Sequence, residues 1–178
     1  MANTDGAFGL RPVHKDARVN KYAVTAGASK IHIGTPVLMA AGGTASVGTA
    51  AALLLGVAVG FFDDEGVPQS YYPGGSVTGW HVMVADDPRQ EFVVQEDSTG
   101  GALALTDRGL NADLVAGTGN DYTGLSGWEL DSSTANTTDT LQCRIIDLYD
   151  DPDNAVGDYA KWVVRINYHF HGDNTAGI

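Results

Sequence analysis

Short runs of alternating apolar and polar residues, bounded by glycine, proline, asparagine and aspartate, recur along this chain. Alternation with a period of two puts every second side chain on one face of a strand, and helix-period patterns are almost absent. We therefore predict an all-β fold, a compact β-sandwich or β-barrel with long glycine-rich loops and little helix. The predicted strands are Tyr22–Thr25, Ile31–Ile33, Pro36–Ala40, Leu53–Phe62, His81–Ala85, Glu91–Gln95, Gly127–Leu130, Thr140–Tyr149 and Lys161–Phe170.

The clearest strand is Lys161–Phe170, in which apolar residues occupy every second position from Trp162 to Phe170. This pattern predicts one apolar face and one mostly polar face. In Thr140–Tyr149 the apolar positions follow the same period and then slip by one residue after Ile145. A slip of this kind is typical of a β-bulge, so we predict one there.

Other segments read as connections between strands. The Asp-Asp-Pro triplets at 86–88 and 150–152 favour the start of a loop, because aspartate bonds its own backbone and proline blocks helix continuation. We expect Ala41–Thr49, which is rich in small residues, to form a loop. Short helical turns are predicted within Thr106–Leu114 and Asn154–Ala160.

The first twenty residues read as an extended arm, and residues 21–178 as a single β-rich domain. Phe8, Leu10 and Val13 are apolar, but the intervening glycine and proline residues cannot sustain a helix. Ordering Thr4–Val13 costs roughly 10 kcal/mol of backbone entropy, and burying the three side chains returns about 6 kcal/mol. The arm therefore needs backbone hydrogen bonds as well, such as those of a strand laid on the sheet edge of a neighbouring chain.

Composition and charge restrict the partners. The 178 residues carry a formal net charge of −12, which opposes direct binding to nucleic acid or to an anionic membrane surface. The longest apolar run, Ala50–Phe62, is too short to span a bilayer. Cys143 is the only cysteine, so an internal disulfide is impossible and folding in an intracellular compartment is favoured.

Familiar catalytic and cofactor motifs are missing from the sequence. No lysine lies in a phosphate-cradling Gly-Lys-Ser or Gly-Lys-Thr context, and Gly117-Thr-Gly119 lacks the third glycine of a dinucleotide fingerprint. There is also no Gly-x-Ser-x-Gly nucleophile elbow, and Ser126 reads as a structural turn residue.

Two patterns leave metal or acid–base chemistry as an alternative. His169, His171 and Asp173 share one face of a strand and offer two nitrogens and a carboxylate to a metal, but the sequence indicates no fourth ligand. Carboxylates cluster at 63–65, 96–97 and 150–153, where calcium binding or a glycosidase pair competes with simple solvated loop charge. We predict no resident metal or cofactor.

Several aromatic residues lie in or beside glycine-rich loops. Such rings suit a surface that binds a sugar or a protein partner, although packing explains each one singly. The candidates are Tyr71, Tyr72, Trp80, Tyr122 and Trp128.

A resemblance to a known family runs through nearly the whole chain, in order. The segments that carry it are Ala7–Val13, Gly56–Phe61, Glu91–Asp97, Leu130–Thr134, Asp153–Gly157 and Ala160–Asn167. Together they resemble small structural proteins of tailed bacteriophages, the capsid decoration or cement proteins. These are packing and turn motifs, and Gly42–Thr49 and Asp63–Gly79 carry no part of the resemblance.

The resemblance implies a β-rich virion protein without enzymatic activity. It implies binding to the outside of an icosahedral shell, where the chain bridges major capsid protein subunits after assembly in the bacterial host cytoplasm. It also implies a homo-oligomer, with a trimer favoured over a dimer. The residues that we expect to bind the capsid are those of the arm, Phe8, Gly9, Leu10, Arg11, Pro12 and Val13.

Two alternatives stay open at this point. One is a phage-surface or tail-associated module that binds host glycans through loop aromatics. The other is a hydrolase that uses paired carboxylates or a metal held by His169, His171 and Asp173.

Overall fold

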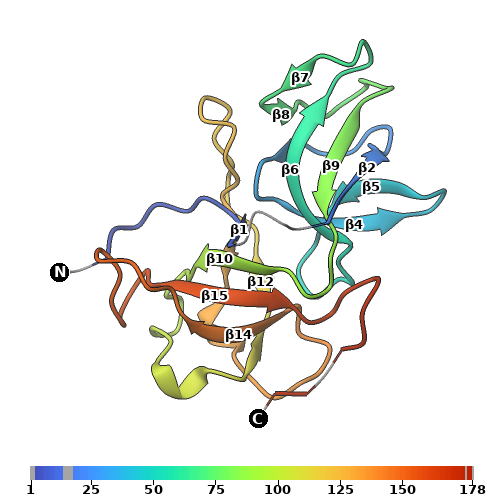
Figure 1. Cartoon of the computed structure of the whole chain (residues 1–178). Helices are drawn as coiled ribbons and strands as arrows, with labels where there is room; N and C mark the ends of the chain where they lie inside the picture. Colours follow the sequence, from blue (N-terminus) through green and yellow to red (C-terminus); the bar gives the residue numbers. More distant parts are fainter. Residues whose placement is uncertain (1–2, 14–17, 175, 178) are drawn as a thin grey trace.

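The structure, a computed structural model, describes residues 3–13, 18–174 and 176–177 and consists almost entirely of antiparallel strands and loops (Figure 1). The all-β prediction is confirmed. No helix in the described ranges is long and apolar enough to cross a membrane. The elements are β1 (Arg11–Pro12), β2 (Val19–Ala23), β3 (Ile31–His32), β4 (Pro36–Ala40), β5 (Thr44–Val47), β6 (Gly56–Phe62), β7 (Pro68–Gln69), β8 (Tyr71–Tyr72), β9 (His81–Ala85), β10 (Glu91–Gln95), the 3₁₀ turn η1 (Leu105–Asp107), β11 (Asn111–Ala112), β12 (Leu114–Val115), β13 (Glu129–Leu130), the 3₁₀ turn η2 (Ser132–Thr134), β14 (Cys143–Leu148) and β15 (Lys161–Ile166).

The strands form two main sheets, which lie one above the other in Figure 1. The upper sheet has the order β2-β9-β6-β4-β5, with β7 added beside β6. The lower sheet has the order β1-β10-β15-β14-β11. Two smaller pairs, β12–β13 and β3–β8, complete the structure. The chain passes from the upper to the lower sheet through the short connection 86–90 between β9 and β10.

The buried side chains form an upper and a lower hydrophobic cluster, and the lower one also takes in Val57 and Ala85 of the upper sheet. The lower cluster is built around Trp162, Phe92 and Ile145, and the upper one around Phe61 and Tyr72, all almost completely buried. Val47 packs against both clusters and so lies where the two meet. The region between the sheets is therefore the place where side chains from distant parts of the sequence come together.

The two most detailed strand predictions are confirmed in register. In β15 the apolar positions Trp162, Val164 and Ile166 are buried, and their neighbours are only partly so. The pairing of β14 with β15 shifts between Ile145 and Asp147, which is the bulge that the slipped apolar pattern predicted. The alternation fails beyond Ile166, because Tyr168 and Phe170 leave the sheet and their backbones bond to Leu54 instead.

Some predicted connections were wrong. The segment 41–49 contains β5, which pairs with β4 through four residues, so small residues alone did not make it a loop. The predicted helical turn in 106–114 corresponds to η1, but this turn begins earlier, and 154–160 forms no helical turn. The two-residue strands β1, β7, β8, β11 and β12 were not predicted, because no longer apolar run surrounds them. The equally short β3 and β13 lie within the predicted runs Ile31–Ile33 and Gly127–Leu130.

The N-terminal segment lies on its own chain (Figure 1). Gly6 N–H donates to the Gln95 side chain, whose amide in turn donates to the Thr4 carbonyl. Arg11 and Pro12 then pair with Val93 and Phe92 as the edge strand of the lower sheet. The backbone hydrogen bonds that the arm requires are thus supplied by the edge of a sheet of the same chain, and not by a neighbouring chain as predicted.

The side chain of Leu10 is also used within the chain. Leu10 is only 1% exposed and belongs to the lower hydrophobic cluster. Its N–H donates to the Gly34 carbonyl at 2.9 Å. Gly9, with a φ of 73°, permits this close approach, since a Cβ there would lie 2.5 Å from the Gly34 oxygen.

Of the predicted arm, residues 1, 2 and 14–17 lie outside the described residues. The upper sheet begins inside the range predicted for the arm, because Val19 and Asn20 belong to β2 and pair with Ala85 and Val84.

Candidate functional site

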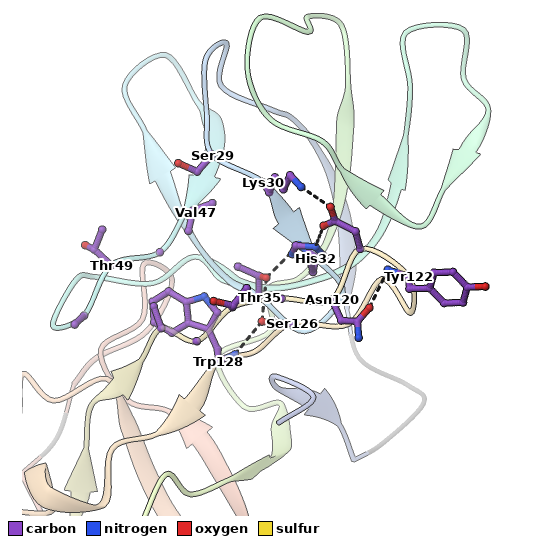
Figure 2. Close-up of a pocket in the computed structure, with 17 residues that line it drawn as sticks. Ser29, Lys30, His32, Thr35, Val47, Thr49, Asn120, Tyr122, Ser126 and Trp128 are labelled. Atoms are coloured by element: carbon purple, nitrogen blue, oxygen red, sulfur yellow. Dashed lines mark hydrogen bonds and ion pairs between the residues drawn. The ribbon is translucent and has the colours of Figure 1, made fainter. Parts of the chain in front are cut away.

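A cavity of about 900 Å³ lies between the upper sheet region and the segment 116–128 (Figure 2). One wall comes from the upper sheet region, with Lys30, His32 and Thr35. The opposite wall comes from the segment 116–127, which we call the bridging loop, and from Trp128 immediately after it.

The bridging loop joins the lower structure to the upper one. It starts after β12 and ends before β13, yet its backbone bonds to Ile33 beside β3. Ile33 N–H donates to the Gly124 carbonyl at 2.8 Å, and Ser126 N–H donates to the Ile33 carbonyl at 2.9 Å. In Figure 1 the loop stands out from the lower sheet as a narrow twisted hairpin in yellow. It closes one side of the cavity.

A continuous chain of polar contacts runs along the cavity wall (Figure 2). The Lys30 ammonium pairs with one oxygen of Asp121, and the other oxygen lies 2.9 Å from His32 Nε2. The backbone N–H of His32 donates to Thr35 Oγ1, and the Thr35 hydroxyl in turn donates to Ser126 Oγ at 3.1 Å. The network fixes the bridging loop against β3 and leaves charged groups at the rim.

The charges at this rim are stabilised by one another. The Lys30 ammonium, and then His32, hold the pKa of the Asp121 carboxyl below its ordinary value, so this group is ionised at neutral pH. The same pairing raises the pKa of Lys30. The His32 ring also stacks on Tyr71, with ring centroids 5.1 Å apart. The rim therefore presents a pair of opposite charges, Lys30 and Asp121, each about half exposed to solvent.

The deeper part of the cavity is apolar. Trp128 is 5% exposed and its indole lies beside Val47 and the small residues that follow β5. Gly119 keeps the opposite wall thin, since a Cβ there would collide with the His32 ring. An aromatic floor with a polar rim suits a ligand that has one flat or apolar side and one hydrogen-bonding side.

Tyr122 lies at the tip of the bridging loop and is 100% exposed. Its N–H bonds to the Asn120 side chain, which holds the turn, and in Figure 2 its ring points away from the cavity. A wholly exposed tyrosine on a fastened hairpin is available to a partner at low entropic cost.

The other aromatic candidates have different positions. Trp128 lines the cavity, and Tyr71 supports its rim from behind His32. Tyr72 is completely buried in the upper cluster, and Trp80 packs edge-on against it at 5.6 Å. Tyr72 and Trp80 are therefore packing residues.

Two of the six predicted arm residues present side chains at the surface together. The Arg11 guanidinium lies 4.7 Å from the centre of the Phe8 ring, and both border a second cavity of about 360 Å³. Gly9 and Leu10 are buried within the chain, and Pro12 and Val13 are half-buried. Of these residues Arg11 is exposed, and Phe8 is half-buried beneath its guanidinium.

The predicted acid and metal patterns have local roles. No group of three or more His, Cys, Asp or Glu side chains is placed to hold a metal ion in the part of the chain that the structure describes. His169 is buried, whereas His171 is exposed and lies 3.9 Å from Asp86. Asp63 and Asp97 bond the backbone of their own turns.

The sequence did not point to Lys30, His32 or Asp121. His32 and Asp121 are 89 residues apart, and each looks like an ordinary polar residue beside a turn. Ser126 was assigned a structural role, and it does accept bonds from Thr35 and from the Trp128 N–H. Its place in the cavity wall had no sequence signal.

Comparison with known proteins adds no relative. No family model, no curated protein and no solved structure matches this chain.

Proposed function

We propose that this chain is a structural attachment protein, a capsid decoration protein that binds the outside of an icosahedral phage shell. The observation that carries the proposal is Tyr122, a fully exposed ring at the tip of a hairpin that is bonded to both halves of the molecule. Anchored aromatic residues of this kind dominate the energy of many protein interfaces. The partner would be the major capsid protein.

Two further features support this proposal. The sequence resemblance to decoration proteins extends from residue 7 to residue 167 in order. The net charge of −12 makes free copies repel one another, which keeps such a protein dispersed until a shell is present.

Fewer residues of the N-terminal arm are proposed to contact the capsid than the sequence alone suggests. Because Leu10 is part of the lower hydrophobic cluster, deleting residues 2–13 would destabilise the fold of the free chain as well as weaken binding to a shell. Phe8 and Arg11 are the arm residues that we propose as a second contact with the capsid, through the aromatic ring and a charge-assisted bond.

The test uses shells assembled without this chain. Wild-type protein, Tyr122→Ala and a control, Tyr159→Ala, are each added to such shells, and bound copies are counted by densitometry of purified particles. We expect saturation at hundreds of wild-type copies per shell, a higher shell melting temperature, and binding weakened at least tenfold by Tyr122→Ala alone. Binding of only a few copies per particle, or of none, contradicts the proposal.

A second candidate function is binding of a host glycan in the large cavity. The specific observation in its favour is the Trp128 indole facing a rim of Lys30, Asp121 and Asn120, which offers stacking and hydrogen bonds together. Saturation-transfer NMR with host surface oligosaccharides tests it. A signal that Trp128→Phe abolishes, with Tyr122→Ala unaffected, would favour this function over shell attachment.

A further inference from the structure

A smaller cavity of about 330 Å³ lies beside the connection 86–90 between β9 and β10. It is formed where the 86–90 connection meets the end of β15 and the segment that follows it. Its walls include Arg89, Arg165, His169 and Asp173. None of these residues belongs to the large cavity or to the arm.

His169 contributes a donor without a partner. The residue is 3% exposed, and its Nδ1 accepts a hydrogen bond from the His171 N–H at 2.9 Å. The proton of the neutral ring is therefore on Nε2. This buried Nε2–H has no acceptor in the described residues. Burial lowers the pKa of His169 to about 4, so the ring is a neutral donor at physiological pH.

An unsatisfied buried donor is costly, and a bound acceptor would remove that cost. The two arginines of the same cavity define the charge of that acceptor. Arg89 is exposed on the connection, and Arg165 projects from β15. Arg89, Arg165 and His169 thus line the same cavity, and guanidinium groups and an imidazole N–H are all donors suited to an oxyanion.

The charge balance favours a monoanion. Asp173 also lines the cavity, so the two arginines and this carboxylate give the cavity lining a formal charge of +1. A phosphate dianion would be repelled by the Asp173 carboxylate and by a molecule of net charge −12 more strongly than a monoanion would.

We propose that this cavity binds a carboxylate, held by Arg89 and Arg165 with the Nε2–H of His169 as a third donor. The carboxylate has two possible sources with the same chemistry, a free carboxylic acid or an acidic side chain of a protein segment. The proposal does not depend on shell attachment, because its residues belong neither to the bridging loop nor to the arm and it is tested without shells.

The experiment follows the His169 ring of the ¹⁵N-labelled full chain by NMR during titration at constant ionic strength. The probes are acetate, the peptide acetyl-Gly-Glu-Gly-amide, its glutamine analogue and inorganic phosphate. We expect acetate and the glutamate peptide to shift the His169 Nε2–H signal, with dissociation constants on the order of 1 mM for so few atoms. A peptide that binds tenfold tighter than acetate identifies a protein segment as the source, and equal affinities identify the free acid.

The variants separate this site from general charge effects. Arg89→Gln, at an exposed position, and Arg165→Gln should each weaken carboxylate binding at least tenfold. Arg108→Gln is the control, since Arg108 is exposed and pairs with Asp147 away from this cavity. The proposal is overturned if the glutamine peptide produces the same shift, if all three variants bind equally, or if phosphate binds more tightly than either carboxylate.

Discussion

Replacing Leu10 with alanine tests whether the N-terminal segment is part of the chain's own core. Leu10 is 1% exposed within the lower hydrophobic cluster, so the substitution removes almost completely buried apolar atoms. Lost transfer free energy and the cavity left behind together cost about 3 kcal/mol for such a change. In a chain of 178 residues this corresponds to a fall in Tm of roughly 6–12 °C.

The assay is thermal unfolding of the free chain, monitored by circular dichroism, together with urea unfolding to obtain the free energy. Leu105→Ala is the matched control, because the same atoms are removed from a side chain that is 46% exposed. We expect Leu105→Ala to change stability by less than about 1 kcal/mol. If Leu10→Ala leaves Tm within the range of this control, Leu10 is not buried in its own chain, and the intramolecular docking of the arm is refuted.

Three other predictions follow from the described structure. Gly9→Ala should lower the free energy of unfolding in urea by about 2–4 kcal/mol, because Gly9 has a positive φ and a Cβ there would collide with Gly34. Gly6→Ala is the control and should be neutral, since a Cβ at Gly6 meets only open space. Equal effects of the two substitutions would contradict the packing described. Burial raises the pKa of Glu96 to about 7, so the contribution of Glu96 to stability is full below about pH 4.5 and is lost as the pH rises through 7. The stability of Glu96→Gln relative to wild type should therefore increase by on the order of 2 kcal/mol between pH 5 and pH 8 in urea unfolding. A difference that does not change with pH would contradict this. Burial raises the pKa of the Cys143 thiol, so it should resist a thiol reagent at pH 8 in the native chain and react after unfolding, and rapid native reaction would show that the site is open.

The strands that could be predicted are those in which local pattern and burial agree. The predicted bounds of β4, β9 and β10 are the observed ones, and the bulge in β14 appears at the predicted slip. These features depend on the period-two geometry of a strand, which each residue and its near neighbours already express. β5 was missed because Thr44–Val47 is built from small residues and has no strong alternation, yet Ala45 is fully buried by its tertiary neighbours.

The sequence by itself determined the class of fold, the strand faces and the need of the N-terminal segment for a sheet edge. Only the tertiary structure decided that this edge belongs to β10 of the same chain and that Leu10 completes the lower cluster. It also decided the cavities on which the proposals rest, because His32 reaches Asp121, and Arg89 lines the same cavity as Arg165, only after long stretches of chain have folded back. The physical reason is that alternation is a property of neighbouring residues, whereas a site depends on which distant surfaces pack together.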